Sequence, residues 1–408
     1  MVRTTSRSGG GSDRNLPAMS MLLLSLLGLF GYLAGERFLL KRRIASVPLR
    51  ITVTGTRGKS SVVRLLASVL REDGRRVVAK TTGSRASCIM PDGSERNIPR
   101  RGMASIIEQK KFVQMAARMN ADCLIAEIMS LHPENHIIES QVLLQPDVVL
   151  MTNVRVDHID AMGGQEDQIA SIYALDIPPG AKVIAPESEI RGPLERAVYR
   201  ANADLITVPG RTASSDSGGG RLMAGGNFLE NLDLVRSAAR ELGVTDETTE
   251  RGIANAEADR GALRIWRYAH KEGRECFLVS GFAANDPKSS ECIIDALPEI
   301  LPEMSGRPVG LLSLRADRGD RTAHWIEELK AGLIDRFVRF FVVGTHSVAM
   351  SRNLSEIRVV KSRKSEQVMQ AVLAEIEDGT AIVGMGNFIG MGEKMISHWQ
   401  SLGTEYEL

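Results

Sequence analysis

The sequence has few aromatic residues and few cysteines, and its charges nearly cancel. Phenylalanine, tryptophan and tyrosine make up only 4% of the 408 residues, which leaves little material for stacking against bases. The formal net charge of +1 argues against a general nucleic-acid-binding protein, and we expect no nucleic-acid partner. The four cysteines form no C-x-x-C pair and suit a reducing compartment. Because Cys and His do not cluster at metal-ligand spacing, a structural zinc site is not expected.

Uncharged apolar runs are also scarce, with one exception near the N-terminus. Residues 1–17 are rich in Ser, Gly and Arg and are predicted to be disordered. Ala18–Gly35 has no charged side chain and lies near the lower limit of about 17–25 residues for a bilayer-spanning helix. Basic residues follow it, which favours a cytoplasmic C-terminal side. We predict a membrane anchor over residues 18–40 with a cytosolic body; a cleaved signal peptide and a buried N-terminal helix are the alternatives.

A glycine-rich loop follows this segment and is the strongest signal in the chain. Ile51–Thr54 is a β-branched run typical of a buried strand, and Val62–Leu70 has helical periodicity. The glycines between them allow backbone N–H groups to face phosphate oxygens, and the helix N-terminus adds partial positive charge. Lys59 would reach the terminal phosphates of a nucleoside triphosphate, and the Ser60 hydroxyl would bind Mg²⁺. The predicted nucleotide-binding residues here are Gly55, Thr56, Arg57, Gly58, Lys59, Ser60 and Ser61.

The loop departs from the longer phosphate-binding pattern G-x-x-x-x-G-K-[ST]. Val53 stands at the position of its first glycine. A chance glycine turn before a surface helix is therefore the alternative. The strand before the loop and the helix after it favour the nucleotide site.

Strands and helices alternate on both sides of a Gly/Ser-rich stretch at Pro209–Gly226. This alternation predicts an α/β fold with mostly parallel sheets and ligand sites at the carboxyl ends of the strands. We predict a central domain over 45–255 and a smaller C-terminal α/β domain over 260–408. The expected strands are Leu49–Thr54, Arg76–Lys80, Asp122–Ile128, Asp147–Thr152, Lys182–Ala185, Asp204–Val208, Glu275–Ser280, Pro308–Leu314, Phe337–Val343, Arg358–Val360 and Thr380–Val383. The expected helices include Ser105–Met119, Gln165–Leu175, Asn227–Leu242, Arg321–Leu333 and Ser365–Ile376.

Two polar sites follow predicted strands. Glu127 ends a hydrophobic strand, where its carboxylate would hold Mg²⁺; capping of a local amide is the alternative. The next strand leads into Asp157-His158-Ile159-Asp160. His158 would bind a second cation, with Asp157 or Asp160 orienting its ring. A polar turn before a helix is the alternative for this segment.

Together these residues resemble the ATP-dependent Mur ligases and folylpolyglutamate synthases. The resemblance includes the glycine loop, Glu127 and the D-H-x-D segment. It extends to Gly226-Asn227…Asn231, which is similar to the family's G-x-N-x-x-N helix, to an arginine at Arg260, an A-N-D-P loop at 284–287 and a G-D-R segment at 319–321. An N-terminal apolar segment followed by T-G-T-R-G-K-S-S is most similar to the ligase subunits of poly-γ-glutamate (capsule) synthases.

This resemblance implies an enzyme that transfers the γ-phosphate of ATP to a carboxylate and then joins the acyl phosphate to an amine. It implies that Lys59, Glu127 and His158 are catalytic, with Ser60, Glu127 and His158 binding the metal. Its implied partners are glutamate, the growing poly-γ-glutamate chain and other membrane subunits of a synthesis and export complex. Asn227 and Arg260 are implied as further ATP ligands. The implied substrate-binding residues are Thr82, Ser84, Arg85 and Asn285.

The chain departs from the family at two positions. Many relatives have a carbamylated lysine in the helix after the D-H-x-D segment, but Gln165–Asp176 contains no lysine. Asn285 stands where many relatives have histidine, so proton transfer is not assigned to that loop. A second metal ion would have to be held differently here.

Three other functions compete with this interpretation. Another Mur-type ligase, such as a folylpolyglutamate synthase, would use similar chemistry. A membrane-tethered nucleotide switch or kinase would turn over nucleotide without forming an amide. A scaffold would bind nucleotide only to hold a complex together. Five arginines near the loops of the first sheet would either bind an acidic polymer, form a solvated basic surface or contact anionic lipid head groups near the anchor, and for Arg85 we favour the substrate: Arg57, Arg85, Arg96, Arg100 and Arg101.

Overall fold

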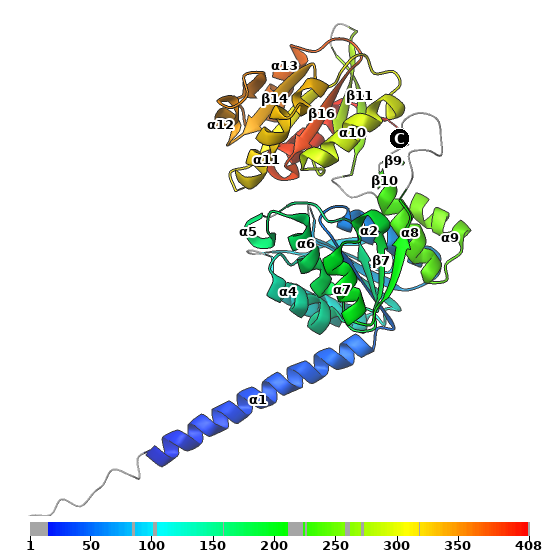
Figure 1. The fold of residues 1–408 in the computed structure, drawn as a ribbon, viewed down its shortest axis with the longest axis vertical. Coiled ribbons are helices and arrows are strands. Elements are labelled where there is room, and N and C mark those ends of the chain that lie inside the picture. The colour runs from blue at the N-terminus through cyan, green and yellow to red at the C-terminus, as the bar shows by residue number, and fades with distance from the viewer. Residues whose placement is uncertain are drawn as a thin grey trace, which may run out of the picture.

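The computed structural model describes residues 15–83, 86–100, 104–157, 159–210, 223–224, 227–257, 262–270, 273–317 and 319–406. Two lobes, each built around a sheet, lie one above the other, and a long helix projects from the lower one (Figure 1). We call the lower one the central lobe, from β1 (Leu49–Thr54) to α9 (Asp246–Ala254), and the upper one the C-terminal lobe, from β11 (Arg264–Ala269) to β17 (Thr404–Tyr406). The α/β fold class predicted from the sequence is confirmed.

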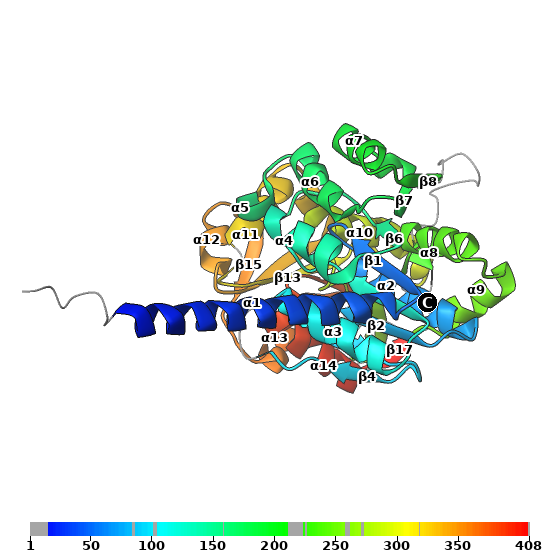
Figure 2. The ribbon, with the colours of Figure 1, turned by 90° about the horizontal axis from the view of Figure 1, so that it is seen from below.

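The projecting helix α1 spans Asn15–Ala45. Its stretch from Met19 has a mean hydropathy of 1.5, is long enough to cross a membrane, and its most apolar window is 0% buried. The alternative of a buried N-terminal helix is therefore wrong for this stretch. Near the C-terminal end, Leu40 and Ile44 join a buried cluster with Phe112 of α3, and α1 lies alongside α3 (Figure 2). The helix begins within the predicted disordered segment and ends beyond the predicted anchor.

The central lobe contains an eight-stranded sheet in the order β4-β3-β2-β5-β1-β6-β7-β8. Six strands are parallel, and β3 and β4 add an antiparallel edge. The six parallel strands were predicted, whereas the β3–β4 hairpin was not. The bounds are β1 Leu49–Thr54, β2 Val77–Thr81, β3 Ser87–Ile89, β4 Glu95–Asn97, β5 Cys123–Glu127, β6 Val148–Met151, β7 Lys182–Pro186 and β8 Asp204–Val208.

Helices cover both faces of this sheet. In α2 every residue from Val62 to Leu70 is buried, because the helix packs on the sheet and is covered by α8 and α9. The predicted helix from Asn227 is wrong at its start: Asn227 and Phe228 form β10, which pairs with β9, Met223–Ala224. The helices are α2 Lys59–Glu72, α3 Ile107–Arg118, α4 Pro133–Ile137, η1 Ile138–Leu144, α5 Ile159–Met162, α6 Glu166–Tyr173, η2 Ala174–Asp176, η3 Glu187–Glu189, α7 Gly192–Arg200, α8 Leu229–Glu241 and α9 Asp246–Ala254.

The C-terminal lobe contains a seven-stranded sheet in the order β15-β14-β13-β16-β12-β11-β17. Five strands run parallel, and two strands that were not predicted complete one side of the sheet: β11 pairs antiparallel with β12, and the edge strand β17 pairs antiparallel with β11. Its strands are β11 Arg264–Ala269, β12 Glu275–Ser280, β13 Val309–Leu314, β14 Arg339–Gly344, β15 Ile357–Val360, β16 Thr380–Gly386 and β17 Thr404–Tyr406. Its helices are α10 Pro287–Ile300, α11 Gly319–Lys330, η4 Leu333–Arg336, α12 Ser347–Ser351, α13 Ser365–Leu373, η5 Phe388–Gly392 and α14 Glu393–Leu402. Each face of the sheet has its own buried apolar cluster.

Candidate active site between the two lobes

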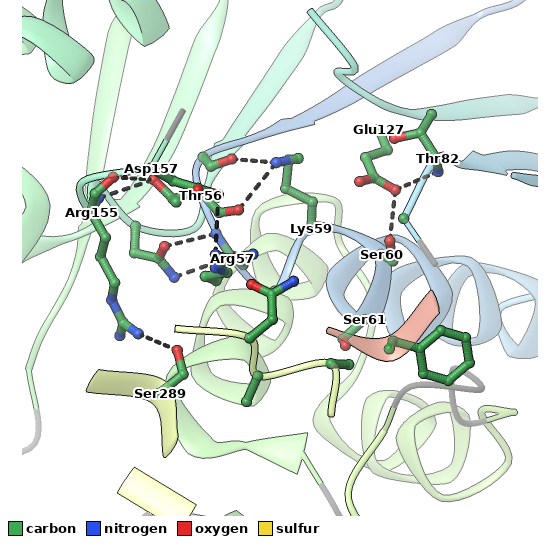
Figure 3. A pocket seen from close by; sticks show the side chains of 18 of the residues that line it. Thr56, Arg57, Lys59, Ser60, Ser61, Thr82, Glu127, Arg155, Asp157 and Ser289 are labelled. Carbon is green, nitrogen blue, oxygen red and sulfur yellow. Dashed lines mark hydrogen bonds and ion pairs between the residues drawn. The ribbon is translucent and has the colours of Figure 1, made fainter. Parts of the chain in front are cut away.

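A cavity of about 460 Å³ lies at the carboxyl ends of the central strands and is lined by residues of both lobes. The central lobe contributes the glycine loop after β1, Glu127 at the end of β5 and the segment after β6. The C-terminal lobe contributes residues 283–285, Arg321 and Asn387. Figure 3 shows the side chains on the central-lobe side converging around this loop. The cavity is therefore where the fold class predicts a ligand site.

The loop between β1 and α2 has the sharp turn that its glycines predict. Gly55 has φ = 123° and Gly58 has φ = 80°, conformations that L side chains rarely adopt. A Cβ on Gly55 would lie 2.2 Å from Thr152 Oγ1. A Cβ on Gly58 would lie 2.5 Å from Asn231 Oδ1. Glycine is needed at both positions for backbone conformation and for space.

We expect Gly55→Ala to lower the free energy of unfolding by about 3 kcal/mol or more, because backbone strain of about 1–3 kcal/mol is added to the clash with Thr152. Urea unfolding of the purified chain measures this loss. Gly180→Ala is the matched control, because Gly180 also has a positive φ but no atom lies within 4 Å of its added Cβ. That control should lose only about 1 kcal/mol. Equal losses in the two variants would contradict the close approach at Gly55.

The segment after β6 holds the loop in place through Asn153. Thr56 N donates to Asn153 O over 2.9 Å, and Arg57 N donates to Asn153 Oδ1 over 2.9 Å. Asn153 Nδ2 donates back to Arg57 O over 3.2 Å. Thr56 Oγ1 accepts a hydrogen bond from Arg155 N over 3.0 Å. The loop conformation is thus set by a segment almost a hundred residues away in the chain.

Lys59 begins α2 and is half-buried beside the loop. Its Nζ donates to Gly55 O over 2.5 Å and to Thr56 O over 3.4 Å. Burial lowers the pKa of Lys59 and outweighs the opposing charges of Glu127, Asp157 and Asp176. An anion in the cavity would supply the negative charge that favours the ammonium form.

Ser60 and Glu127 form an oxygen-rich pair at one side of the cavity. Ser60 Oγ donates to Glu127 Oε2 over 2.7 Å, and Thr82 N donates to the same oxygen over 2.6 Å (Figure 3). A hydroxyl beside a carboxylate fits Mg²⁺, which takes few protein ligands and completes its shell with phosphate and water. Within the described ranges, no group of three or more His, Cys, Asp or Glu side chains could hold a metal ion.

Several predicted residues cannot be placed. His158, Ser84, Arg85 and Arg260 lie outside the described residues, and for Asn227 only the backbone is described. Of the others, Ser61, Thr82 and Asn285 line the cavity. Asn285 Oδ1 is buried with no hydrogen-bond partner in the part of the chain that the structure describes. The guanidinium of Arg57 is ion-paired to carboxylates of both lobes.

A buried histidine–carboxylate pair below the loop was not predicted. His136 Nδ1 lies 2.9 and 3.0 Å from the two oxygens of Asp176, and Asp176 Oδ2 accepts from Thr54 Oγ1 over 2.6 Å. Both side chains are fully buried. Burial alone would lower the pKa of His136, but the charge of Asp176 and its hydrogen bond outweigh it and raise the pKa above 6.5. The pair joins residues 40 apart in sequence, so no local motif announces it.

The raised pKa of His136 predicts a pH-dependent stability. The pair stabilises the fold fully below the unfolded-state pKa of 6.5 and loses this contribution as the pH rises through the folded-state pKa. We expect the unfolding free energy to decrease over that range in the unmodified chain and to be flatter in His136→Gln. Urea unfolding between pH 6 and 9 measures both slopes. His132→Gln, at an exposed position, is the control and should keep the slope of the unmodified chain. An unchanged slope in His136→Gln would show that the pH dependence does not come from the His136–Asp176 pair.

Comparison with known proteins gives two domain matches. Residues 53–207 match the Mur ligase middle domain, and residues 265–402 match the poly-gamma-glutamate synthase CapB C-terminal domain. The two regions coincide with the sheets of the central and C-terminal lobes.

Curated relatives are named for capsule or polymer synthesis. The chain is 32% identical over 291 residues to the capsule biosynthesis protein CapB of Bacillus anthracis, covering 71% of this chain and 62% of that protein. It is 28% identical over 364 residues to the PGA synthase CapB of Bacillus subtilis (strain 168), covering 87% of this chain and 91% of that protein. The matched region thus spans less than two thirds of the first relative and most of the second.

Solved structures share the fold at low identity. E. coli FolC in complex with DHPP and ADP superposes with a TM-score of 0.65 at 17% identity, covering 90% of this chain and 92% of that one. MurF from Acinetobacter baumannii superposes with a TM-score of 0.63 at 15% identity, covering 89% and 79%. At this identity, the similarity to the solved structures shows a shared fold alone. The two domain matches are similarities of sequence. The chain therefore contains a region matching the Mur ligase middle domain, followed by a region matching the poly-gamma-glutamate synthase CapB C-terminal domain.

Proposed function

We propose that the chain is an ATP-dependent amide ligase that polymerises glutamate through γ-amide bonds. One observation carries this proposal: the phosphate-binding loop and the Ser60–Glu127 pair open into a cavity that a CapB-type lobe completes. The names of the Bacillus relatives support the poly-γ-glutamate product. The domain bounds that we propose are 45–255 and 260–408, after the anchor.

The proposed chemistry begins with activation of a carboxylate, because a carboxylate and an amine do not condense spontaneously in water. A carboxylate oxygen of the substrate attacks the γ-phosphorus of ATP, ADP leaves, and an acyl phosphate forms. Lys59 neutralises the charge that develops on the transferred phosphoryl group. Ser60 and Glu127 are the residues that would hold Mg²⁺, with His158 proposed as a further ligand. The cation would supply charge neutralisation at the phosphate oxygens.

The amine of the second substrate then attacks the acyl carbon, and phosphate leaves from the tetrahedral intermediate. Asn285 Oδ1 supports this step, because it is a buried acceptor without a partner among the described residues and lies on the cavity wall. It would accept a hydrogen bond from the incoming amine. Closure of the lobes would exclude water, which otherwise hydrolyses the acyl phosphate.

The remaining assignments are proposals of the same kind. Thr82, Ser84 and Arg85 would bind the carboxylates of glutamate or of the growing chain, since guanidinium groups bind carboxylates in pairs of hydrogen bonds. Asn227 and Arg260 would bind ATP. The glycine-loop residues Gly55, Thr56, Gly58 and Ser61 would surround its phosphates.

We place the protein at the cell membrane, with α1 as a single anchor and both lobes in the cytoplasm. The apolar, unburied helix α1 and the basic residues in its last turns support this location. Other membrane subunits of a polymer-export complex are the proposed partners. We expect deletion of residues 1–35 to move the protein from the membrane pellet to the supernatant after ultracentrifugation. Continued pelleting of the truncated protein would show that the lobes attach to the membrane by themselves.

Incubation of membranes carrying the chain with ATP, Mg²⁺ and labelled glutamate tests the proposed function. A labelled, protease-resistant polymer with ADP and phosphate as co-products is the expected result. Nucleotide turnover without an amide product would indicate a switch or kinase, and no reaction would indicate a scaffold. Polymer extension on a folate but not on free glutamate would indicate a folate ligase. Parallel reactions with L- and D-glutamate identify the enantiomer used.

A further inference from the structure

Arg57 is the only loop residue for which the structure gives ion pairs to both lobes within the described residues. Its Nη2 lies 3.1 Å from Asp157 Oδ2 in the central lobe, and its Nε lies 3.0 Å from Asp286 Oδ2 in the C-terminal lobe. The Arg57 side chain is 17% exposed, and the two carboxylates are 8% and 11% exposed. The loop therefore contacts the C-terminal lobe through an almost buried cation.

A second arginine, in the C-terminal lobe, contacts a carboxylate of the central lobe. Arg321 of α11 places Nη2 3.1 Å from Asp157 Oδ2 and Nε 3.3 Å from Asp157 Oδ1. The four groups form an alternating series Asp286–Arg57–Asp157–Arg321 with no net charge. Two of its three ion pairs, Arg57–Asp286 and Arg321–Asp157, cross between the lobes. We call this series the interlobe charge cluster.

Asp286 has two separate roles in this cluster. Its Oδ1 caps α10 by accepting from Ser289 N over 2.9 Å, while its Oδ2 faces Arg57. Burial would raise the pKa of Asp286, but Arg57 and the hydrogen bonds from Ser289 outweigh it and lower the pKa. Arg155 Nη1 also donates to Ser289 Oγ over 3.0 Å (Figure 3), so the first turn of α10 is bound to the central lobe twice.

Because the interlobe charge cluster is largely buried, separating its charges costs free energy. Charged groups withdrawn from water are stable only when they are paired, and removing one partner leaves the other as an uncompensated buried charge. Opening the lobes would separate Arg57 from Asp286 and Arg321 from Asp157 together. A change in lobe position therefore acts directly on the residue between Thr56 and Gly58, inside the phosphate-binding loop.

We propose that Arg57 is a positioning residue that fastens the phosphate-binding loop to the C-terminal lobe, so that lobe closure and loop conformation depend on each other. Its guanidinium acts between Asp157 and Asp286, and its neighbours Gly58 and Lys59 remain the groups that face phosphate. This coupling between lobe closure and loop conformation adds to the proposed function. Its effect on the rate of polymer formation rests on that function. The lobe positions themselves are measurable without catalysis.

Distance measurements between the lobes test the coupling directly. Spin labels at Tyr199→Cys in the central lobe and Val348→Cys in the C-terminal lobe, both exposed positions, report lobe separation in the full chain in nanodiscs. Cys292→Ser removes the one native cysteine that is not fully buried. We expect Arg57→Gln and Asp286→Asn each to shift the distance distribution toward longer values. Asparagine can still cap α10, so Asp286→Asn loses the ion pair and keeps the helix start.

The double variant and a matched control make the test selective. Both changes remove the Arg57–Asp286 pair, and Arg57→Gln removes the Arg57–Asp157 pair as well, so the double variant should open no further than Arg57→Gln alone. Arg236→Gln removes an arginine paired with Glu250 in the same lobe, away from the cavity, and should leave the distances unchanged. Single variants with the original distribution, or fully additive shifts, would overturn the proposal. If Arg57→Gln does not fold, Asp286→Asn alone decides the outcome.

Nucleotide affinity supplies a second readout. If the closed population falls to about a tenth, the apparent Kd for a non-hydrolysable ATP analogue should rise about tenfold. Arg57→Lys, which retains the charge without the forked geometry, should recover part of this loss. An unchanged Kd in Arg57→Gln would contradict the coupling. Shifted distances in a protein that forms no glutamate polymer would leave this inference standing and reject the proposed function instead.

Discussion

Lys59→Ala is expected to lower the rate of polymer formation by about a hundredfold to a thousandfold, the typical cost of removing one preorganised charge-stabilising donor. Lys59 stands at the start of α2 beside the cavity, and its ammonium is held by the carbonyls of Gly55 and Thr56. Of the two basic residues in the loop, we expect Lys59 to bind the terminal phosphate, because Arg57 is ion-paired to two carboxylates. Labelled-glutamate incorporation by membranes measures the loss.

Loss of fold would not explain this result. Alanine relieves the desolvation of the Lys59 ammonium but also removes its hydrogen bonds to Gly55 O and Thr56 O, so urea unfolding of Lys59→Ala is measured beside its activity, and a folded variant is expected. Lys182→Ala removes a half-exposed lysine paired with Glu241 and serves as the matched control with normal activity. Both variants should remain in the membrane fraction. A normal polymer yield from Lys59→Ala would refute the assignment of the loop as the ATP site.

Glu127→Gln should raise the divalent-cation concentration needed for activity by about a hundredfold or more. Loss of an outer-shell partner of a metal ligand typically costs 10–100-fold in affinity, and loss of a ligand charge should cost no less. Glutamine retains an oxygen that can accept from Ser60 Oγ and Thr82 N, as Glu127 Oε2 does. The substitution therefore changes the charge of the site and leaves its shape nearly intact.

Electron paramagnetic resonance of Mn²⁺ gives a measurement that does not depend on turnover. We expect Mn²⁺ titrated with an ATP analogue to bind the unmodified chain and to bind Glu127→Gln at least about a hundredfold more weakly. Glu241→Gln changes a carboxylate far along α8 and should leave Mn²⁺ binding unchanged. Equal Mn²⁺ affinity in Glu127→Gln would remove Glu127 from the metal site.

Local sequence predicted the elements that carry most of the site. The six parallel central strands and the loop from Gly55 to Ser60 were recognised from residue patterns, since a buried strand followed by a glycine loop and an amphipathic helix has a specific sequence period at each step. The strands at and next to one edge of each sheet were missed: β3, β4, β11 and β17 are short or partly exposed. Such strands lack the continuous apolar run that marks a strand buried on both faces.

Pairings between distant residues were harder to predict. Glu127 was expected near the loop because each lies where a predicted strand ends. The hydrogen bond from Ser60 to Glu127 agrees with that expectation. His136 with Asp176, and Arg57 with Asp286, have no sequence signal, because ion pairs depend on positions in space that local periodicity does not encode. Arg57 was expected to bind ATP, and its partners in the other lobe were not foreseen.

The sequence by itself determined the α/β class, the apolar N-terminal helix and the phosphate-binding loop, since each depends on hydrophobic period and backbone freedom over about a dozen adjacent residues. Only the tertiary structure decided which strand ends are neighbours, and thereby that Ser60 meets Glu127. It also decided that Asp286, a carboxylate of the C-terminal lobe, lies against Arg57. The reason is physical: strand order and lobe contact arise from the burial of whole faces, which many distant residues share.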